Sequence, residues 1–320
     1  MPRLAAAICA IAAVICAVPP GTALASGPCK TDPEKDSRPL FDGIVLHEES
    51  CEKPLYHAFV IEMDLHTPGY RFLVTPYNEK LSKTSEFAAL HDAIIAVNGG
   101  FWGSSWGGFT MSDGKTWPVE SADDAVSTVV GFGKRTKKGR LRVGIRPAEE
   151  ILEAPLPWMR EALFANAVLL EKGKVVEHQI EGPVFKNRNP RTAVGLTKDK
   201  GTLLIAVVDG RQDDWSKGMK MTRLAKLLKS YGAWRAANLD GGSSSTMVIP
   251  SLGGIVNRPS FKKGPERVVA NHLGILRTTE VGPMSALLRL FEPLGMLVSV
   301  IHGIPGHMVV WKTLCTSISP

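Results

Sequence analysis

Short apolar runs that end in glycine, proline or polar residues recur along most of the chain, a pattern typical of β-strands. Two of these runs, 192–197 and 202–208, are separated only by the polar segment 198–201, which predicts a hairpin. The remaining runs that we interpret as strands are 58–65, 70–74, 93–97, 126–133, 141–146 and 268–276.

Helical spacing of apolar residues is confined to two short segments. Thr84 or Ser85 is placed to begin a helix that runs through His91. Apolar positions from Met221 to Tyr231 recur at helical intervals, and a glycine follows as a stop signal. Because strands predominate and hairpins outnumber crossovers, we expect an α+β fold, mostly antiparallel sheet with a few packed helices, in a single domain.

The N-terminus has the features of a secretory signal peptide. Arg3 supplies a positive charge, residues 4–18 are apolar without a charge, and an Ala-x-Ala site at 23–25 follows. We expect the signal peptide to span residues 1–25 and the protein to be secreted or periplasmic. Residues 26–56 are polar and rich in proline, and we interpret them as an N-terminal segment that leads into the fold and lies outside the core.

The last part of the chain, 281–320, is an apolar extension beyond the expected domain. Residues 293–311 carry no Asp, Glu, Lys or Arg, but Pro305 and several glycines would interrupt a membrane helix. We interpret the extension as surface-associated or disordered, with a membrane helix as the alternative.

Three cysteines remain once the signal peptide is removed. Cys29 and Cys51 could close a short N-terminal loop as a disulfide, which an oxidising compartment favours. Cys315 has no obvious partner, and no Cys/His spacing resembles a zinc site.

The charge balance favours acidic partners. The formal net charge of +7 suits phosphorylated glycans or anionic envelope surfaces. Nucleic acid is disfavoured, because no nucleic-acid motif or stripe of aromatic and basic residues accompanies the charge. Five cations crowd one predicted turn, and we interpret it as a solvated hairpin tip, with an anion site as the alternative. They are Lys134, Arg135, Lys137, Lys138 and Arg140.

In four places an apolar run delivers a polar side chain to an end that contains glycine or proline. A strand held by the core can position such a side chain more rigidly than a free loop could. Each stretch alone is also explained as a turn, but four in order indicate a site. They are Asn98-Gly99-Gly100, Asn189-Pro190-Arg191-Thr192, Asp209-Gly210-Arg211 and Asp240-Gly241-Gly242-Ser243-Ser244.

This ordered set resembles the phosphodiester glycosidase family. The resemblance runs from about His57 to about Arg277, with Met111-Ser112-Asp113-Gly114 in register, and implies a catalytic domain over residues 57–280. Ser243 stands where many relatives carry another glycine. The resemblance implies an exported hydrolase that cleaves the bond between the anomeric carbon of a sugar and a phosphodiester oxygen, in a phosphorylated glycan or cell-envelope polysaccharide.

The resemblance also suggests roles for single residues. Asp240 is expected as nucleophile or base, Asp209 as its partner, and Arg191 as the clamp on the phosphate oxygens. The residues expected to bind substrate are Asn98, Gly99, Gly100, Asn189, Thr192, Arg211, Gly241, Gly242, Ser243, Ser244 and Arg267. We expect no cofactor and assign no metal ligand, and a divalent cation stays open.

Other functions stay open beside this one. An exported protein that binds or assembles exopolysaccharide would keep the pocket and lack turnover. A metal-dependent phosphodiesterase could use Asp113, Asp209 and Asp240, although two-metal sites need a denser cluster of ligands. A serine hydrolase is disfavoured, because Ser243 and Ser244 do not stand in a Gly-x-Ser-x-Gly pattern.

Overall fold

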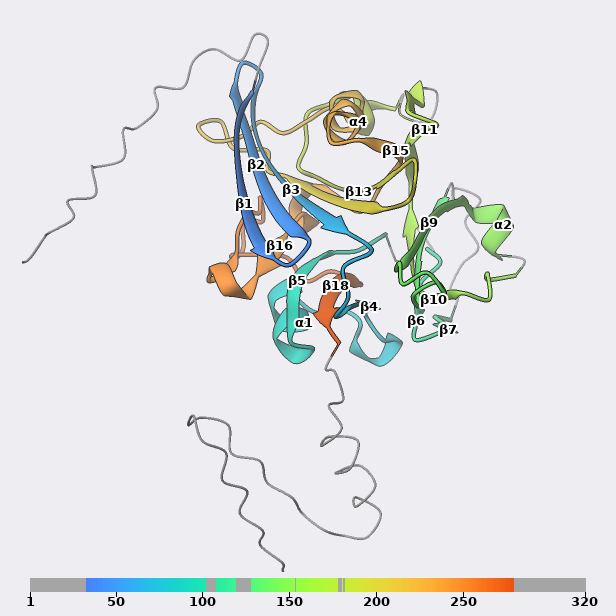
Figure 1. Cartoon of the computed structure of the whole chain (residues 1–320). Helices are drawn as coiled ribbons and strands as arrows, with labels where there is room; N and C mark the ends of the chain where they lie inside the picture. The colour runs from blue at the N-terminus through green and yellow to red at the C-terminus, as the bar shows by residue number, and fades with distance from the viewer. Residues whose placement is uncertain are drawn as a thin grey trace, which may run out of the picture.

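The computed structural model describes residues 33–101, 108–118, 128–152, 154–177, 180 and 182–278 (Figure 1). The predicted signal peptide, Cys29, Cys315 and the extension 281–320 lie outside these residues. Within the described ranges, no helix combines the length and the apolarity needed to cross a bilayer.

The largest sheet has eight strands in the order β1-β2-β3-β14-β13-β15-β11-β12. Every neighbouring pair in it is antiparallel. Its strands are β1 (Glu34–Phe41), β2 (Ile44–Glu52), β3 (Leu55–Asp64), β11 (Ala167–Glu171), β12 (Lys174–Val175), β13 (Arg191–Thr197), β14 (Thr202–Val208) and β15 (Ala233–Asn238).

Two five-stranded sheets accompany the large one, in the orders β17-β16-β5-β18-β4 and β7-β6-β10-β8-β9. The strands of the first are β4 (Tyr70–Val74), β5 (Ala93–Asn98), β16 (Met247–Ile249), β17 (Gly254–Ile255) and β18 (His272–Arg277). Those of the second are β6 (Met111–Ser112), β7 (Lys115–Thr116), β8 (Thr128–Gly133), β9 (Arg142–Pro147) and β10 (Met159–Ala165). The helices are α1 (Thr84–Leu90), α2 (Ala148–Leu152), α3 (Pro183–Lys186) and α4 (Met221–Ser230), with 3-10 turns η1 (Tyr77–Glu79), η3 (Gly242–Ser244) and η4 (Pro250–Leu252).

The large sheet is buried on both faces, because the side chains of its central strands alternate between two cores. In β14, Leu203 and Ile205 belong to the core shared with the two smaller sheets, whereas Leu204 and Ala206 belong to the core that α4 covers (Figure 1). A strand buried on both faces has an apolar side chain at every position. This double burial explains why β13 and β14 are continuous apolar runs in the sequence.

The short helices cover the smaller sheets. Phe87 and Ala88 of α1 pack on the sheet that contains β4, β5 and β18. Ala148 and Ile151 of α2 pack on β8 and β10. The smaller sheets therefore lie between the large sheet and a thin outer layer of helix.

The predicted antiparallel sheet with few helices is confirmed, and a single domain stays a prediction. The interpretation of residues 26–56 as lying outside the core is wrong where the structure describes them. Residues 34–52 form β1 and β2, and Ile44 and Leu46 are fully buried in the shared core. Apolar and polar side chains alternate in the first part of β2, so its few apolar residues hide in a polar stretch. The sequence pattern also does not indicate β10 or β11.

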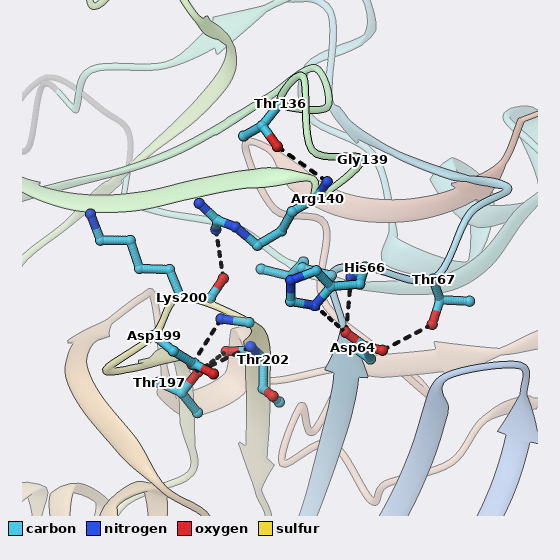
Figure 2. Close-up of polar contacts among 12 residues, drawn as sticks. Asp64, His66, Thr67, Thr136, Gly139, Arg140, Thr197, Asp199, Lys200 and Thr202 are labelled. Carbon is cyan, nitrogen blue, oxygen red and sulfur yellow. Dashed lines mark hydrogen bonds and ion pairs between the residues drawn. The ribbon is translucent and has the colours of Figure 1, made fainter.

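Two turns meet beside the end of β3 (Figure 2). The Arg140 guanidinium, in the turn between β8 and β9, donates to the Lys200 carbonyl in the β13–β14 turn at 2.6 Å. Asp64 is hydrogen-bonded to the main chain and the ring of His66, and Asp199 caps its own turn. Each carboxylate is thus engaged locally, beside a cluster of cations.

Candidate active site

The four stretches singled out in the sequence meet at one edge of the large sheet. β14 and β15 lie on either side of β13 and antiparallel to it, so both end where β13 begins. Asp209 follows β14, and Asp240 follows β15 after one intervening residue. β5 carries Asn98 to the same place, since the Asp240 N–H donates to the Gly99 carbonyl at 3.1 Å. Segments far apart in the chain therefore form one region.

A hollow of about 170 Å³, which we call the Asp240 hollow, opens in this region. The charged residues among its described lining residues are Asp240 and Arg267. The other lining residues are Leu81, Gly100, Ser244, Val268, Val269 and Ala270.

The main chain of Asp240 is fixed by Asn98. The Asn98 amide donates to the Asp240 carbonyl at 2.7 Å. The amide oxygen of Asn98 accepts from the Thr192 hydroxyl at 2.7 Å and from the Thr246 N–H at 3.2 Å. Asn98 and Thr192 are fully buried, so both hold the loop of Asp240 in place. The prediction that these two side chains bind substrate directly is wrong.

Opposing effects act on the Asp240 carboxyl. Burial raises its pKa, whereas the Ser244 hydroxyl, the Gly241 N–H and the charge of Arg267 lower it. The Gly241 N–H donates to Oδ1 at 2.8 Å. The Ser244 hydroxyl lies beside the carboxylate without a hydrogen bond of regular geometry. Among the described residues no regular hydrogen bond reaches Oδ2, which leaves this oxygen able to act on a substrate.

Arg267 stands at the rim of the hollow with an exposed side chain. Its Nη1 lies 3.4 Å from the Ser243 hydroxyl. The residue before it, Glu266, is 2% exposed and accepts from the Ser85 N–H at 3.3 Å and from the Ser85 hydroxyl. Ser85 belongs to α1, so Glu266 fastens the segment of Arg267 to that helix. The sequence pattern does not indicate Glu266, which stands in a charged, mostly exposed stretch.

The floor of the hollow depends on close backbone contacts. The Gly100 N–H donates to the Asn271 side-chain oxygen at 2.8 Å, and a Cβ on Gly100 would collide with the Phe164 carbonyl. Asn271 is fully buried, and its carbonyl also accepts from the Gly99 N–H at 2.8 Å. The two glycines therefore admit protein atoms, and Gly100 lines the hollow as well. Sequence reasoning missed Asn271, whose only signal is a polar residue placed directly before an apolar strand.

Asp209, the predicted partner of Asp240, is 1% exposed and is not among the lining residues of the hollow. Its Oδ1 accepts from the Asn257 amide and the Arg258 N–H, both at 2.9 Å. Its Oδ2 accepts from the Trp215 indole at 2.7 Å. Burial raises the pKa of Asp209, and these donors oppose the shift. Since Asn257 also donates to the Ser245 carbonyl at 3.1 Å, Asp209 supports the loop that follows Asp240.

Arg191, the predicted phosphate clamp, is also occupied by the protein. Its side chain is buried, and Nε donates to the Met219 carbonyl at 3.0 Å. Nη2 donates to the carbonyls of Val184 and Asn187 at 2.7 Å and 2.9 Å. Burial, with the charge of Arg211 as a second cause, lowers the pKa of Arg191 to about 10. The structure therefore gives Arg191 a structural role, and the role of phosphate clamp falls to another cation.

The remaining predicted residues lie around the glycine turn. A Cβ on Gly242, whose φ is +65°, would lie 3.0 Å from Nη2 of Arg211. The same Nη2 donates to the Asn189 side-chain oxygen at 3.2 Å. The Gly242 N–H donates to the Pro190 carbonyl at 2.9 Å, and a Cβ on Gly241 would lie 2.9 Å from this carbonyl. These residues shape the turn after Asp240 from its outer side.

The carboxylates considered for a metal site are engaged in different ways. Asp113 forms an ion pair with Arg160 at 2.5 Å, in the turn between β6 and β7. Asp209 is surrounded by the donors described above, and Asp240 lines its own hollow. In the part of the chain that the structure describes, no group of three or more His, Cys, Asp or Glu could hold a metal ion.

Comparison with known sequences points to one family. The chain matches the phosphodiester glycosidase family over residues 91–276. It is 30% identical over 172 residues to the N-acetylglucosamine-1-phosphodiester alpha-N-acetylglucosaminidase of Mus musculus, across 48% of this chain and 31% of the mouse protein. The Homo sapiens protein of the same name is 30% identical over 184 residues, across 51% of this chain and 33% of that protein. The chain thus spans about a third of the length of these relatives.

Solved structures show the same fold. The catalytic domain of the zebrafish N-acetylglucosamine-1-phosphodiester alpha-N-acetylglucosaminidase, auto-inhibited by its pro-peptide, superposes with a TM-score of 0.55 at 22% identity. That match covers 79% of this chain and 87% of the zebrafish chain. A protein of Burkholderia pseudomallei also gives a TM-score of 0.55, at 17% identity and with 69% of this chain and 74% of that chain covered.

Proposed function

Since the chain belongs to the phosphodiester glycosidase family, we propose that it hydrolyses the bond between the anomeric carbon of a sugar and a phosphodiester oxygen. The observation that carries this proposal is the Asp240 hollow, in which a partly desolvated carboxylate faces open space with an arginine at the rim. The family match includes both Asp240 and Arg267.

Asp240 is the carboxylate that acts at the anomeric carbon. Cleavage of a glycosidic bond passes through an oxocarbenium-like state, which a nearby carboxylate can stabilise or trap as a covalent intermediate. Oδ1 is already fixed by the Gly241 N–H, so Oδ2 is the oxygen that faces the sugar. The hydrogen bond from Asn98 to the Asp240 carbonyl keeps the carboxylate in place during the reaction.

Arg267 replaces Arg191 as the cation for the departing phosphate. A phosphate is a better leaving group than a sugar alkoxide, so a strong general acid is less necessary than a cation that binds the developing charge. The planar guanidinium suits phosphate oxygens and stays charged at every relevant pH. Glu266 positions this group by holding its segment against α1.

The substrate class follows from the family and from the charge of the chain. We propose a phosphorylated glycan or a cell-envelope polysaccharide, which the net charge of +7 also favours. The same proposal places the protein outside the cytoplasm, because residues 1–25 have the features of a cleaved signal peptide.

The test is turnover of a synthetic sugar-1-phosphodiester by purified protein, with and without chelator. We expect free sugar and a phosphate monoester at the same rate in both conditions. Chelator-sensitive release of a sugar phosphate would support a phosphodiesterase in its place. Saturable binding of the substrate without any product would support a binding or assembly protein.

A further inference from the structure

A second hollow, of about 260 Å³, lies on the sheet that contains β8, β9 and β10. We call it the basic hollow. Four of its described lining residues are cations, and none is a carboxylate. The lining residues are Lys134, Arg135, Arg142, Pro157, Trp158 and Arg160.

Glycines in two strands make room for the tryptophan of the basic hollow. A Cβ on Gly133 of β8 would lie 2.8 Å from the Trp158 ring, and a Cβ on Gly144 of β9 would lie 3.1 Å from it. The indole therefore rests directly on the backbone of both strands, as strand glycines allow. Arg142 lies directly opposite Gly133 in the antiparallel pair, so its side chain projects from the same face as the indole.

The cations are held in place by the protein. Arg135 donates to the carbonyls of Leu65, His66, Thr67 and Gly139, which fix the guanidinium without neutralising its charge. Arg160 forms an ion pair with Asp113, a residue with an exposed side chain. A fixed cation binds an anion at a lower cost in side-chain entropy than a free one.

The surroundings of the basic hollow add positive charge. Arg140 of the adjoining turn reaches the Lys200 carbonyl (Figure 2), which places a further cation beside Arg135 and Lys134. The acidic residues near this turn do not offset the charge directly, because Asp64 is engaged with His66 and Asp199 caps its own turn.

We propose that the basic hollow is a second binding site for an acidic glycan, in which Trp158 packs against a sugar ring and the surrounding arginines and Lys134 bind phosphate groups. An aromatic face with fixed cations at its edge matches a ring that is apolar on one face and carries anionic substituents. The volume suits a few sugar units and not an extended duplex. The choice of a glycan rests on the proposed function, since a glycan phosphodiester is the substrate proposed for Asp240.

The basic hollow and the Asp240 hollow lie at opposite ends of β10. That strand begins beside Trp158, and its Phe164 carbonyl packs against Gly100 of the Asp240 hollow. At about 3.3 Å per residue the two sites are roughly 20 Å apart along the strand. A polymer can reach from one to the other, whereas a small glycoside cannot. The basic hollow is therefore suited to hold a polymeric substrate away from the reacting bond.

The test is equilibrium binding of a phosphomannan and of the same mannan without phosphate. We expect the wild-type chain to bind the phosphomannan at least about tenfold more tightly, with an affinity that falls as salt is added. The double change Lys134→Gln and Arg142→Gln, whose side chains are not packed in a core, should abolish this preference. Trp158→Ala should weaken binding of both mannans, with its folding checked by circular dichroism. Lys226→Gln, an exposed cation on α4, is the control and should bind like the wild-type chain.

Equal binding of the two mannans, or full phosphomannan binding by the double variant, would overturn the proposal. Equally tight binding of single-stranded DNA at the same charge concentration would also overturn it in favour of a general polyanion surface. These outcomes are independent of turnover. A chain that hydrolyses the synthetic substrate but binds no phosphomannan refutes only the basic hollow, and the reverse result refutes only the proposed activity.

Discussion

The ends of β14 and β15 carry the same sequence motif and have different environments. Each strand is followed by an aspartate and a glycine, Asp209-Gly210 and Asp240-Gly241, at the same edge of the sheet. Both carboxyls have a raised pKa because both are buried. Asp209 accepts hydrogen bonds at both oxygens from Trp215, Asn257 and the Arg258 main chain, whereas the Asp240 hollow leaves one oxygen of Asp240 open.

The difference shows that hydrogen-bond saturation separates a structural carboxylate from a reactive one. A carboxylate whose lone pairs are filled by the protein holds loops together and has little left for a substrate. The same reasoning separates the two arginines, because Arg191 donates to three carbonyls while Arg267 stands exposed beside Asp240. Neither burial nor a raised pKa alone would have made this distinction.

The largest effect is expected from Asp240→Asn. The isosteric amide cannot stabilise or trap an oxocarbenium ion, so kcat/KM should fall on the order of ten-thousand-fold. The melting temperature should change by less than about 2 °C, since the main-chain contacts that hold the loop remain. Steady-state kinetics and calorimetry check both expectations. Turnover close to that of the wild-type chain would remove Asp240 from the chemistry.

Arg267→Gln should give the second-largest effect. Loss of the cation that binds the departing phosphate should lower kcat/KM by about 10²–10³-fold, without loss of stability. Arg211→Gln is the matched control, because Arg211 is also exposed near the glycine turn but contacts Asn189. Its kcat/KM should fall much less. A larger loss in the Arg211 variant than in the Arg267 variant would exchange their proposed roles.

Asp209→Asn should give the opposite profile to Asp240→Asn. One accepting oxygen becomes an N–H donor, so at least one buried donor loses its acceptor at a cost of about 1–3 kcal/mol in unfolding free energy. The melting temperature should fall by several degrees, while turnover per folded molecule stays within about tenfold of wild type. A stable but inactive Asp209→Asn protein would restore Asp209 as a catalytic partner.

The smallest effect is a shift of the pH profile. The raised pKa of Asp240 should place the acidic limb of kcat/KM above the value of about 3.9 for a free aspartate. Because the Arg267 charge lowers this pKa, Arg267→Gln should move the limb to higher pH, and Arg211→Gln should leave it in place. A limb that moves to lower pH in the Arg267 variant would contradict the assigned contact.

The same pKa shift has a consequence for stability. A carboxyl whose pKa is higher in the folded than in the unfolded chain binds more protons when folded, so stability falls as pH rises between the two values. Asp240→Asn should remove this contribution, and the difference in melting temperature between variant and wild type should grow as pH rises through that window.

Strong local signals made much of the fold predictable. The continuous apolar runs of β13 and β14 follow from burial on both faces, and the helical spacing of Met221 to Tyr231 gave α4. β2 was missed because it lies near the edge of its sheet, where few apolar positions are needed. Its buried Ile44 and Leu46 are too few to form a recognisable pattern.

The candidate site was predictable in its location and less so in its roles. Strand-end polar residues with nearby glycines indicated the right edge of the sheet, and Asp240 among them. The roles of Arg191 and Asn98 depend on which main-chain groups fold against them, and these come from distant parts of the chain. Glu266 and Asn271 act through contacts of this kind too, so neither has a sequence signal of its own.

The most direct test of the central claim is hydrolysis of a sugar-1-phosphodiester in water labelled with oxygen-18. Attack at the anomeric carbon, as the position of Asp240 implies, predicts the label in the anomeric hydroxyl of the released sugar and none in the phosphate monoester. Label in the phosphate would mean that the phosphorus–oxygen bond breaks, and would contradict the assignment of this chain as a glycosidase.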